Sequence, residues 1–217
     1  MKLWTTLTEP ILRQNPVTLQ ILGICSALAV TTTLAAAITM SLCLTAVLVA
    51  ASGIISTIRK HLPSSIRLIV QIIIVASLVI VVDQILQAFF FEMSQRLSVY
   101  VSLIATNCVV LGRTESFALH NKPLSSMTDA LGNGLGYSLI LIIIGSVREL
   151  FGHGTLLGYS VLPTVEQGGW FEPLPLMLLA PSAFFLLGGL VWLIRSLMPK
   201  QVETPEHKLV PAEEVPG

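Results

Sequence analysis

Long apolar runs separated by short clusters of charged residues dominate this sequence. Residues 14–58 contain no Asp, Glu, Lys or Arg, and at about 20 residues per crossing this stretch is long enough to span a membrane twice. The pattern over the whole chain predicts an all-α integral membrane protein with six transmembrane segments. Their predicted positions are residues 17–30, 34–58, 68–91, 97–112, 129–147 and 176–194.

The first and fourth predicted segments are short for a full crossing, and each carries a cysteine near its middle. The first begins just after Pro16 and contains Gly23, so we expect these two segments to be short or broken helices. A comparison of the chain with itself at an offset of 83 residues aligns the two segments. The residue pairs that coincide are Cys25 with Cys108, Leu28 with Leu111 and Thr31 with Thr114. We interpret the two segments as copies of one element.

Composition supports a membrane location and excludes some partners. The 217 residues are 53% hydrophobic and 11% charged, whereas about a quarter of the residues of an average soluble domain are charged. The mean hydropathy is +0.83. The net charge is zero and no basic patch is interleaved with aromatic residues, so no nucleic-acid partner is expected. Three cysteines are an odd number, which argues against a disulfide framework.

The distribution of basic residues predicts the orientation. Ten of the twelve Lys and Arg residues fall at the N-terminus, after segments two and four, or in the C-terminal tail. Because cytoplasmic connections carry the excess of Lys and Arg, we expect both termini in the cytoplasm. Segments one to three and four to six then enter from opposite faces as a 3+3 inverted repeat, a plan used by transporters. Cys25 and Cys108 would meet near the membrane midplane.

This topology divides the chain into three parts. They are a cytoplasmic N-terminus at 1–16, a six-segment transmembrane domain at 17–195 and a flexible cytoplasmic tail at 196–217. The N-terminal residues contain no small-residue cleavage site after a short apolar core. No removable signal peptide is therefore expected, and the first segment directs insertion.

Two paired thiols favour an iron-sulfur or zinc site, but such a site typically takes four ligands. The four histidines all lie in predicted loops or in the tail, and Cys43 has no counterpart in the second half. We therefore expect a partner chain to supply a second pair of cysteines, and we interpret Cys43 as a packing residue. The alternative is that Cys25 and Cys108 are also small buried apolar residues.

Asp83 is the acidic residue that lies deep inside a predicted segment. A buried carboxylate in a membrane is costly, so a role in cation movement is the default hypothesis. The alternative is a structural pair with Gln84 or Gln87. Asp129 lies at the mouth of the fifth segment, where it fits an N-cap.

Other features of the sequence have structural explanations. Arg113 and Glu115, at the end of the fourth segment, fit interfacial anchors. The glycines at 132, 134 and 136 have the wrong spacing for a dinucleotide-binding motif and follow no strand, so we interpret them as sites of close helix packing. The sequence contains no Ser-His-Asp, paired-carboxylate or phosphate-loop arrangement, and this chain alone is not expected to catalyse group transfer.

Several longer motifs resemble those of a known family. They are NP at 15–16, LGICSALAVT at 22–31, VVDQ at 81–84, TNC at 106–108, GR at 112–113, GNGLGY at 132–137, RELFG at 148–152 and LLAPSAFF at 178–185. Together they resemble the D-subunit family of the bacterial sodium-translocating NADH:quinone reductase, over about residues 15–195. The sister family in the ion-translocating ferredoxin:NAD oxidoreductase shares the cysteine segments. The GGW stretch at 168–170 and the APSA stretch at 180–183 fit the quinone reductase better.

The resemblance implies a component of an inner-membrane complex that passes electrons from NADH to ubiquinone and couples this to sodium export. It implies that Cys25 and Cys108 bind an iron or [2Fe-2S] centre together with two cysteines of the homologous E-type subunit. FAD, FMN, riboflavin and a further [2Fe-2S] centre would belong to the other components, the A, B, C and F subunits. The resemblance also makes Asp83 and Asp129 candidates for the sodium path. The alternatives are the equivalent subunit of an ion-translocating ferredoxin:NAD oxidoreductase and a secondary transporter built on the inverted repeat.

Overall fold

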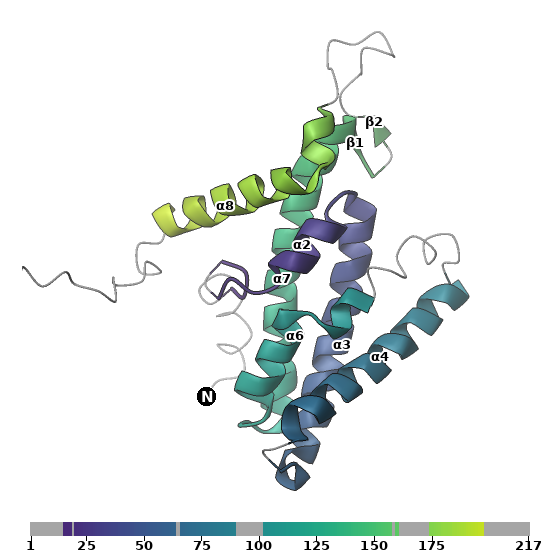
Figure 1. Cartoon of the computed structure of the whole chain (residues 1–217), viewed down its shortest axis with the longest axis vertical. Coiled ribbons are helices and arrows are strands. Elements are labelled where there is room, and N and C mark those ends of the chain that lie inside the picture. The colour runs from purple at the N-terminus through teal and green to yellow at the C-terminus, as the bar shows by residue number, and fades with distance from the viewer. Residues whose placement is uncertain are drawn as a thin grey trace, which may run out of the picture.

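The computed structural model describes residues 15–18, 20–63, 66–89, 102–157, 159–160 and 174–197. This part of the chain is mostly helical (Figure 1). Its longer helices are α3 (Leu34–Ile58), α4 (Arg67–Phe89), α7 (Pro123–His153) and α8 (Ala180–Leu197). Its short elements are α2 (Ile24–Val30), η1 (Arg59–His61), α6 (Cys108–Arg113), the π-helical turn η3 (Thr114–Ala118), β1 (Thr155–Leu156), β2 (Tyr159–Ser160) and η5 (Pro175–Leu178).

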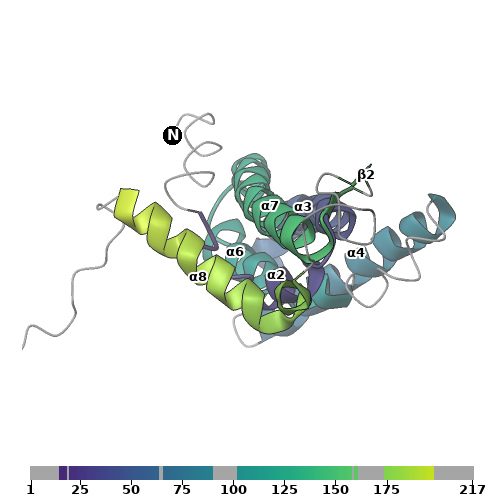
Figure 2. The same cartoon turned by 90° about the horizontal axis from the view of Figure 1, so that it is seen from above.

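Helices α3 and α7 lie side by side and run in opposite directions (Figures 1 and 2). The backbone amide of Leu34, at the start of α3, donates to Oε2 of Glu149 near the end of α7 at 2.5 Å. At the opposite end of the pair, Oγ of Ser56 donates to the carbonyl of Asn121, just before α7, at 2.6 Å. The two hydrogen bonds join the start of each helix to the end of the other.

Small residues allow this close approach of α3 and α7. A Cβ added at Gly134 would lie 2.7 Å from Cγ2 of Thr45, and one at Gly145 would lie 3.2 Å from Cβ of Ala37. Such contacts are typical of helix pairs in membranes, where close backbone packing replaces the hydrophobic effect. The predicted role of the Gly-rich stretch in helix packing is therefore confirmed at Gly134.

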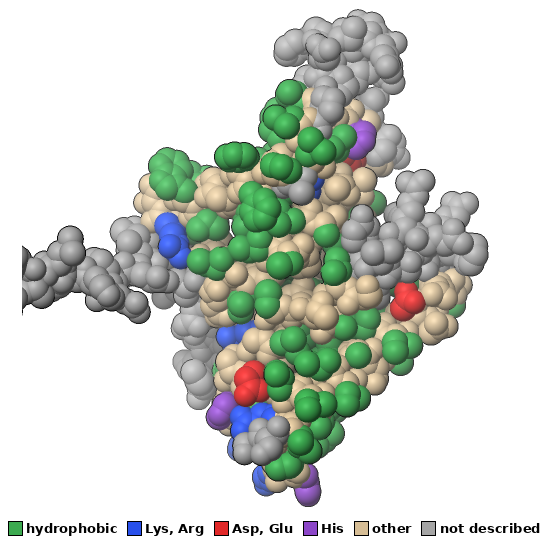
Figure 3. All heavy atoms as spheres, in the orientation of Figure 1, with side chains coloured by type: hydrophobic (Ala, Val, Ile, Leu, Met, Phe, Trp, Pro, Cys, Tyr) green, Lys and Arg blue, Asp and Glu red, His purple; other side chains and the backbone are tan. Residues whose placement is uncertain are grey.

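Helices α4 and α8 diverge from the α3–α7 pair and extend in different directions (Figure 2). Both carry large exposed apolar side chains: Leu68, Ile69, Ile73, Ile80, Val81 and Ile85 on α4, and Phe184, Phe185, Trp192, Leu193 and Leu197 on α8. Hydrophobic side chains cover the middle of the face in Figure 3, whereas several charged side chains gather at its lower end. Apolar surface of this extent is typical of contact with lipid or with another chain.

Three helices in the described part of the chain are long and apolar enough to cross a membrane. They are α3 with its extension η1 (Leu34–His61), α4 over Arg67–Ala88, and α7 (Pro123–His153). The predicted class, an all-α membrane protein, is therefore confirmed. Six crossings and a 3+3 inverted repeat stay predictions.

The predicted second segment coincides with α3, and the third differs from α4 by one residue at its start. The fifth segment was predicted too short, because α7 begins at Pro123 and ends at His153. Proline is favoured in the first helical turn because its missing amide has no helical partner there. At the other end, Gly154 has a φ of 69° and terminates the helix.

The predicted sixth segment is divided in the structure. Residues Pro175–Leu178 form the 3-10 turn η5, Leu179 is extended, and α8 begins at Ala180. Pro181 fixes its own φ and lacks an amide hydrogen, so it can begin a helix but cannot continue one from η5. The helix α8 then runs to Leu197, three residues beyond the predicted end.

Some predicted features lie outside the described residues. These are most of the N-terminal part, at 1–14, the start of the fourth segment at 97–101, the GGW stretch at 168–170 and the tail beyond residue 197.

Candidate functional site

The two cysteine segments meet at the beginnings of their short helices. The backbone amide of Gly23 donates a hydrogen bond to Sγ of Cys108 at 2.9 Å, although 85 positions separate the two residues in the chain. Cys25 follows Gly23 in the first turn of α2, and Cys108 is the first residue of α6. The structure therefore brings together the two motifs that the sequence comparison aligned.

Both predicted short segments are interrupted just before their cysteines. Ile21 and Gly23 have positive φ angles of 55° and 79°, so the first segment becomes helical only at α2. A Cβ added at Gly23 would lie 2.7 Å from Cε2 of Tyr137 and 2.8 Å from Cγ2 of Val109. In the other segment Asn107 caps α6, because its Oδ1 accepts the amide of Val109 at 2.9 Å.

The meeting point lies at mid-height of α7. Tyr137, whose ring packs beside Gly23, is near the middle of this 31-residue helix, which is about 46 Å long at 1.5 Å per residue. From there α2 leads to the C-terminal end of α7, where Nη1 of Arg148 donates to Oγ1 of Thr31 at 2.7 Å. The helix α6 leads toward the N-terminal end of α7. The two short helices thus run from one central point toward opposite ends of the molecule.

The three thiols differ in exposure. Cys25 is exposed, Cys108 is half-buried and Cys43 is buried in α3. The predicted packing role of Cys43 agrees with its burial. No group of three or more His, Cys, Asp or Glu side chains that would hold a metal ion occurs among the described residues. Two cysteines are half of a tetrahedral set of ligands, and of the three thiols those of Cys25 and Cys108 are the ones that are not buried.

A buried hydrogen-bond network lies beside the two cysteines. The hydroxyl oxygens of Ser26 and Tyr137 are 2.5 Å apart, and Nδ2 of Asn107 donates to Oγ of Ser26 at 2.8 Å. Ser26 in turn donates to the carbonyl of Gly23 at 3.1 Å. Sequence reasoning did not identify Ser26 or Tyr137 as part of the site. Asn107 was visible as an amide inside an apolar run.

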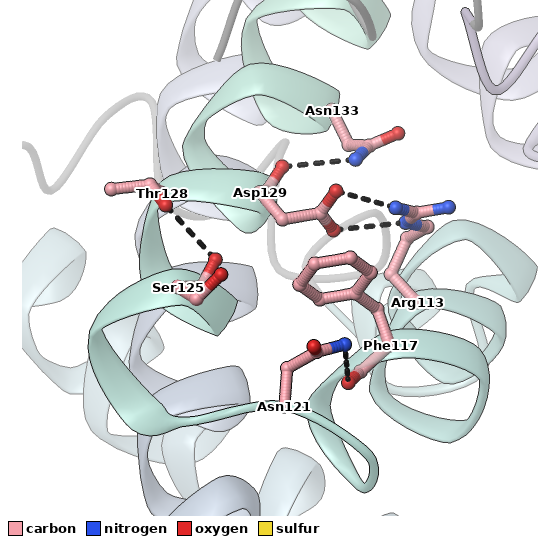
Figure 4. A network of polar contacts seen from close by, with 7 residues as sticks. All are labelled: Arg113, Phe117, Asn121, Ser125, Thr128, Asp129 and Asn133. Atoms are coloured by element: carbon pink, nitrogen blue, oxygen red, sulfur yellow. Dashed lines mark hydrogen bonds and ion pairs between the residues drawn. The ribbon is translucent and has the colours of Figure 1, made fainter. Parts of the chain in front are cut away.

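Arg113 and Asp129 form a bidentate ion pair between α6 and α7 (Figure 4). The two nitrogen–oxygen distances are 2.5 Å and 3.1 Å, and the side chains are 13% and 5% exposed. The guanidinium group also lies 5.5 Å from the ring centroid of Phe117. The N-cap role predicted for Asp129 is wrong, because α7 begins six residues earlier and Asp129 lies inside the helix. Arg113 is likewise the partly buried partner of Asp129 and not an interfacial anchor.

Glu115 also has partners on another helix. Its Oε2 accepts a hydrogen bond from Nε2 of Gln71 at 2.7 Å, and its Oε1 lies 3.3 Å from Nη1 of Arg67. Gln71 is fully buried. These contacts join η3 to the start of α4, so the carboxylate connects two elements and does more than anchor a helix end.

Asp83 lies on α4 and is partly buried. Its Oδ2 accepts a hydrogen bond from Nε2 of Gln87 at 2.8 Å. Its Oδ1 is buried and has no hydrogen-bond partner in the described part of the chain. The pairing with Gln87 matches the structural alternative considered from the sequence. The sodium-path role of Asp83 and of Asp129 stays a prediction.

Arg148 is a fully buried cation that sequence reasoning placed in a loop. The structure places it inside α7, where its guanidinium group joins the end of α2 to η5 and the start of α8. It donates to the carbonyls of Leu28, Met177, Leu178 and Leu179 and to Oγ1 of Thr31, at 2.7 to 3.3 Å. These acceptors compensate for burying the charge. The position of the α2 helix therefore depends on both Arg148 and the contacts near Gly23.

Comparison with known proteins gives consistent matches over nearly the whole chain. A family model described as "Rnf-Nqr subunit, membrane protein" matches residues 3–191. A protein of Psychromonas ingrahamii, named as the D subunit of the Na(+)-translocating NADH-quinone reductase, is 56% identical over 200 residues, covering 92% of this chain and 95% of the relative. The proteins of the same name from Pseudoalteromonas atlantica and Pseudomonas aeruginosa are 57% and 56% identical, covering 91% and 94% of this chain and 94% and 92% of those relatives.

Proposed function

Because this chain belongs to the Rnf-Nqr family of membrane-protein subunits, we propose that it is the D-type subunit of a sodium-translocating NADH:quinone reductase complex. Relatives that carry this name are 56–57% identical over more than nine-tenths of the chain. The family resemblance predicted from the motifs is thereby confirmed. The relatives are subunits of an oxidoreductase complex, the Na(+)-translocating NADH-quinone reductase.

We propose that Cys25 and Cys108 hold an iron or [2Fe-2S] centre. The observation that carries this proposal is the convergence of the two cysteine segments at mid-height of α7, with a backbone amide donating to one of the sulfurs. Thiolates are the preferred ligands of such centres. An N–H donor stabilises negative charge on sulfur, so the environment of Cys108 fits a metal-bound thiolate. When bound, the centre would accept and release one electron at a time near the middle of the membrane, away from both surfaces.

The missing two ligands would come from the homologous E-type subunit, with two cysteines of its own. Cys25 and Thr106 are exposed next to the two helix breaks. Irregular backbone at membrane depth is tolerated only where protein covers it or where it lines a water-filled cavity, and in this proposal another protein chain covers this side. A partner with the same pair of broken helices would present its thiols to the same point, which makes a homologue the simplest partner.

The inverted topology is part of the proposal. The sequence equivalence of α2 with α6, and the antiparallel packing of the helices α3 and α7 that follow them, support a 3+3 inverted repeat with six crossings. The basic residues Arg59, Lys60 and Lys122 all lie where α3 ends and α7 begins. We assign this end to the cytoplasm of the bacterial inner membrane, with the N-terminus at 1–16, the transmembrane domain at 17–195 and the tail at 196–217.

The remaining parts of the reaction would lie elsewhere in the complex. In this proposal, the A, B, C and F subunits bind NADH, ubiquinone, FAD, FMN, riboflavin and a further [2Fe-2S] centre. Electron transfer through the complex is coupled to sodium export. We include Asp83 and Asp129 as candidates for the sodium path, because each places a carboxylate within an apolar helix.

The three cysteines provide a matched test in the purified whole complex. We expect Cys25→Ser and Cys108→Ser to lower the iron content by one centre and to abolish NADH-driven ubiquinone reduction. Cys43→Ser, which changes a thiol buried in α3, should keep the full iron content and the full rate of ubiquinone reduction. Full iron content and full activity in Cys108→Ser would contradict the iron site. Sodium transport by the isolated chain in liposomes would instead favour a secondary transporter.

A further inference from the structure

A buried hydrogen-bond network beside the cysteines joins Ser26, Asn107 and Tyr137. Nδ2 of Asn107 donates to Oγ of Ser26. The hydroxyl oxygens of Ser26 and Tyr137 are 2.5 Å apart, and either hydroxyl can donate to the other. Both hydroxyls also lie within hydrogen-bond reach of the carbonyl oxygen of Gly23, at 3.1 Å and 3.5 Å. A serine hydroxyl has one donor and two acceptor sites, so these three neighbours can satisfy Ser26.

The network connects three helices at the point where the cysteines meet. Ser26 belongs to α2, Asn107 caps α6, and Tyr137 belongs to α7. Ser26 and Asn107 each lie next to a cysteine in the chain, so a shift of their backbone would also move a sulfur atom. Tyr137 is fully buried on the long helix, which makes it the fixed member of the three.

The ring of Tyr137 also sets the position of the Gly23 backbone. It lies so close to Gly23 that no side chain would fit between them. The hydroxyl oxygen is 3.5 Å from the carbonyl oxygen of Gly23, while the amide of the same residue points to Sγ of Cys108. Tyr137 thus lies beside the carbonyl of Gly23, and Cys108 accepts the hydrogen bond from its amide.

We propose that Tyr137 is a positioning residue for the thiols, which it controls through Ser26, Asn107 and the Gly23 amide. This inference rests on the proposed iron site. Groups that orient metal ligands typically change metal affinity or activity by about 10- to 100-fold when they are removed. Hydrogen bonds to the sulfur ligands also contribute to the reduction potential of iron centres. Tyr137 therefore controls how firmly iron is held and at which potential it is reduced.

The test uses Tyr137→Phe, Ser26→Ala and the double variant in the whole complex. Ser138→Ala is the control, since it removes a neighbouring hydroxyl of α7 that donates to the carbonyl of Gly134, one turn earlier in the same helix, at 2.7 Å. Three quantities are measured: the iron content, the rate of iron loss to a chelator, and the midpoint potential from a redox titration followed by electron paramagnetic resonance.

We expect Tyr137→Phe to contain iron but to lose it to the chelator about tenfold faster. Its midpoint potential should be more negative, because the reduced centre loses stabilisation by the Gly23 amide. Ser26→Ala should change both quantities in the same direction, and the double variant should match Ser26→Ala, since the two residues act through one hydrogen bond. Ser138→Ala should behave as the unmodified complex.

Unchanged iron loss and an unchanged potential in both Tyr137→Phe and Ser26→Ala would overturn the inference while leaving the iron site intact. If the complex with Tyr137→Phe fails to assemble, the iron loss and the midpoint potential of Ser26→Ala alone test the inference. The failure of the proposed function looks different: Cys108→Ser would then retain the iron of the unmodified complex, and the positioning role would be excluded with it.

Discussion

The backbone amide of Gly23 lies 2.9 Å from Sγ of Cys108. This contact is possible because Gly23 has no side chain and has a φ of 79°, which allows the peptide to turn between Tyr137 and Val109. The contact joins two parts of the chain that lie in the same kind of element, a short helix that begins inside the apolar core.

Gly23→Ala should disrupt the junction. The new Cβ would lie less than 3 Å from both Tyr137 and Val109, and the backbone strain and overpacking should each cost about 1–3 kcal/mol. We expect a lower midpoint of thermal unfolding and a lower iron content in the purified complex. Gly188→Ala is the control, because nothing lies within 4 Å of a Cβ added there. Equal behaviour of the two variants would contradict the role of Gly23.

Asp129→Ala should leave the partly buried guanidinium of Arg113 without its counter-charge, which should cost up to about 3–5 kcal/mol. The double variant with Arg113→Ala should recover much of this loss, since no charge is then left unpaired. Thermal unfolding of the complex measures both the loss of stability in Asp129→Ala and its recovery in the double variant. The apparent sodium affinity of the stable double variant shows whether Asp129 lies on the sodium path or serves only as the ion-pair partner of Arg113. Unchanged affinity would remove Asp129 from the sodium path and leave it as a structural partner.

Asp83→Asn should preserve the hydrogen bond from Gln87, because the new side chain keeps a carbonyl oxygen in the place of Oδ2. A purely structural role therefore predicts no change in stability or activity. If the carboxylate lies on the sodium path, loss of its charge should weaken apparent sodium affinity by about tenfold, equivalent to about 1.4 kcal/mol. The sodium dependence of ubiquinone reduction distinguishes these outcomes, and Gln87→Leu tests the hydrogen bond separately.

Arg148→Lys should destabilise the end of α2 and the start of α8 together. A lysine keeps the charge but has three donors on one nitrogen, so it cannot reach the carbonyls on both sides as the guanidinium group does. Each lost hydrogen bond to a charged group is worth about 1.5–3 kcal/mol. We expect a large drop in the thermal midpoint of the complex. Arg59→Lys is the matched control, as the contact of Arg59 with the carbonyl of Leu119 is long, at 3.4 Å.

Gly134→Ala should push α3 and α7 apart, because its Cβ would lie 2.7 Å from Cγ2 of Thr45. Overpacking of this kind costs about 1–3 kcal/mol. Thr45→Ala removes Cγ2 and Oγ1, the two atoms nearest to the new methyl group, so the double variant should be more stable than Gly134→Ala alone. Thermal unfolding is again the measurement. Additive losses in the double variant would show that this contact does not set the helix spacing.

Local physical properties explain what the sequence predicted correctly. The second segment was placed at residues 34–58 and matches α3, because an uninterrupted apolar run after a threonine cap has few alternatives to a helix. The meeting of the two cysteine segments, seen in the contact of Gly23 with Cys108, followed from the internal repeat. Asp129, Arg148 and Glu149 were misplaced because charged residues normally end an apolar helix. Here each finds a partner from another element, so α7 continues through all three.

The sequence by itself determined the membrane class, the positions of the main apolar helices and the two cysteine segments that meet in the structure. These depend on hydrophobic length and on repeated motifs, which are properties of adjacent residues. The tertiary structure alone decided that Gly23 donates to Cys108, that Tyr137 reaches Ser26, and where each buried charge finds its partner. Such contacts join positions far apart in the chain, and burial makes them necessary because an unpaired polar group inside an apolar core is costly.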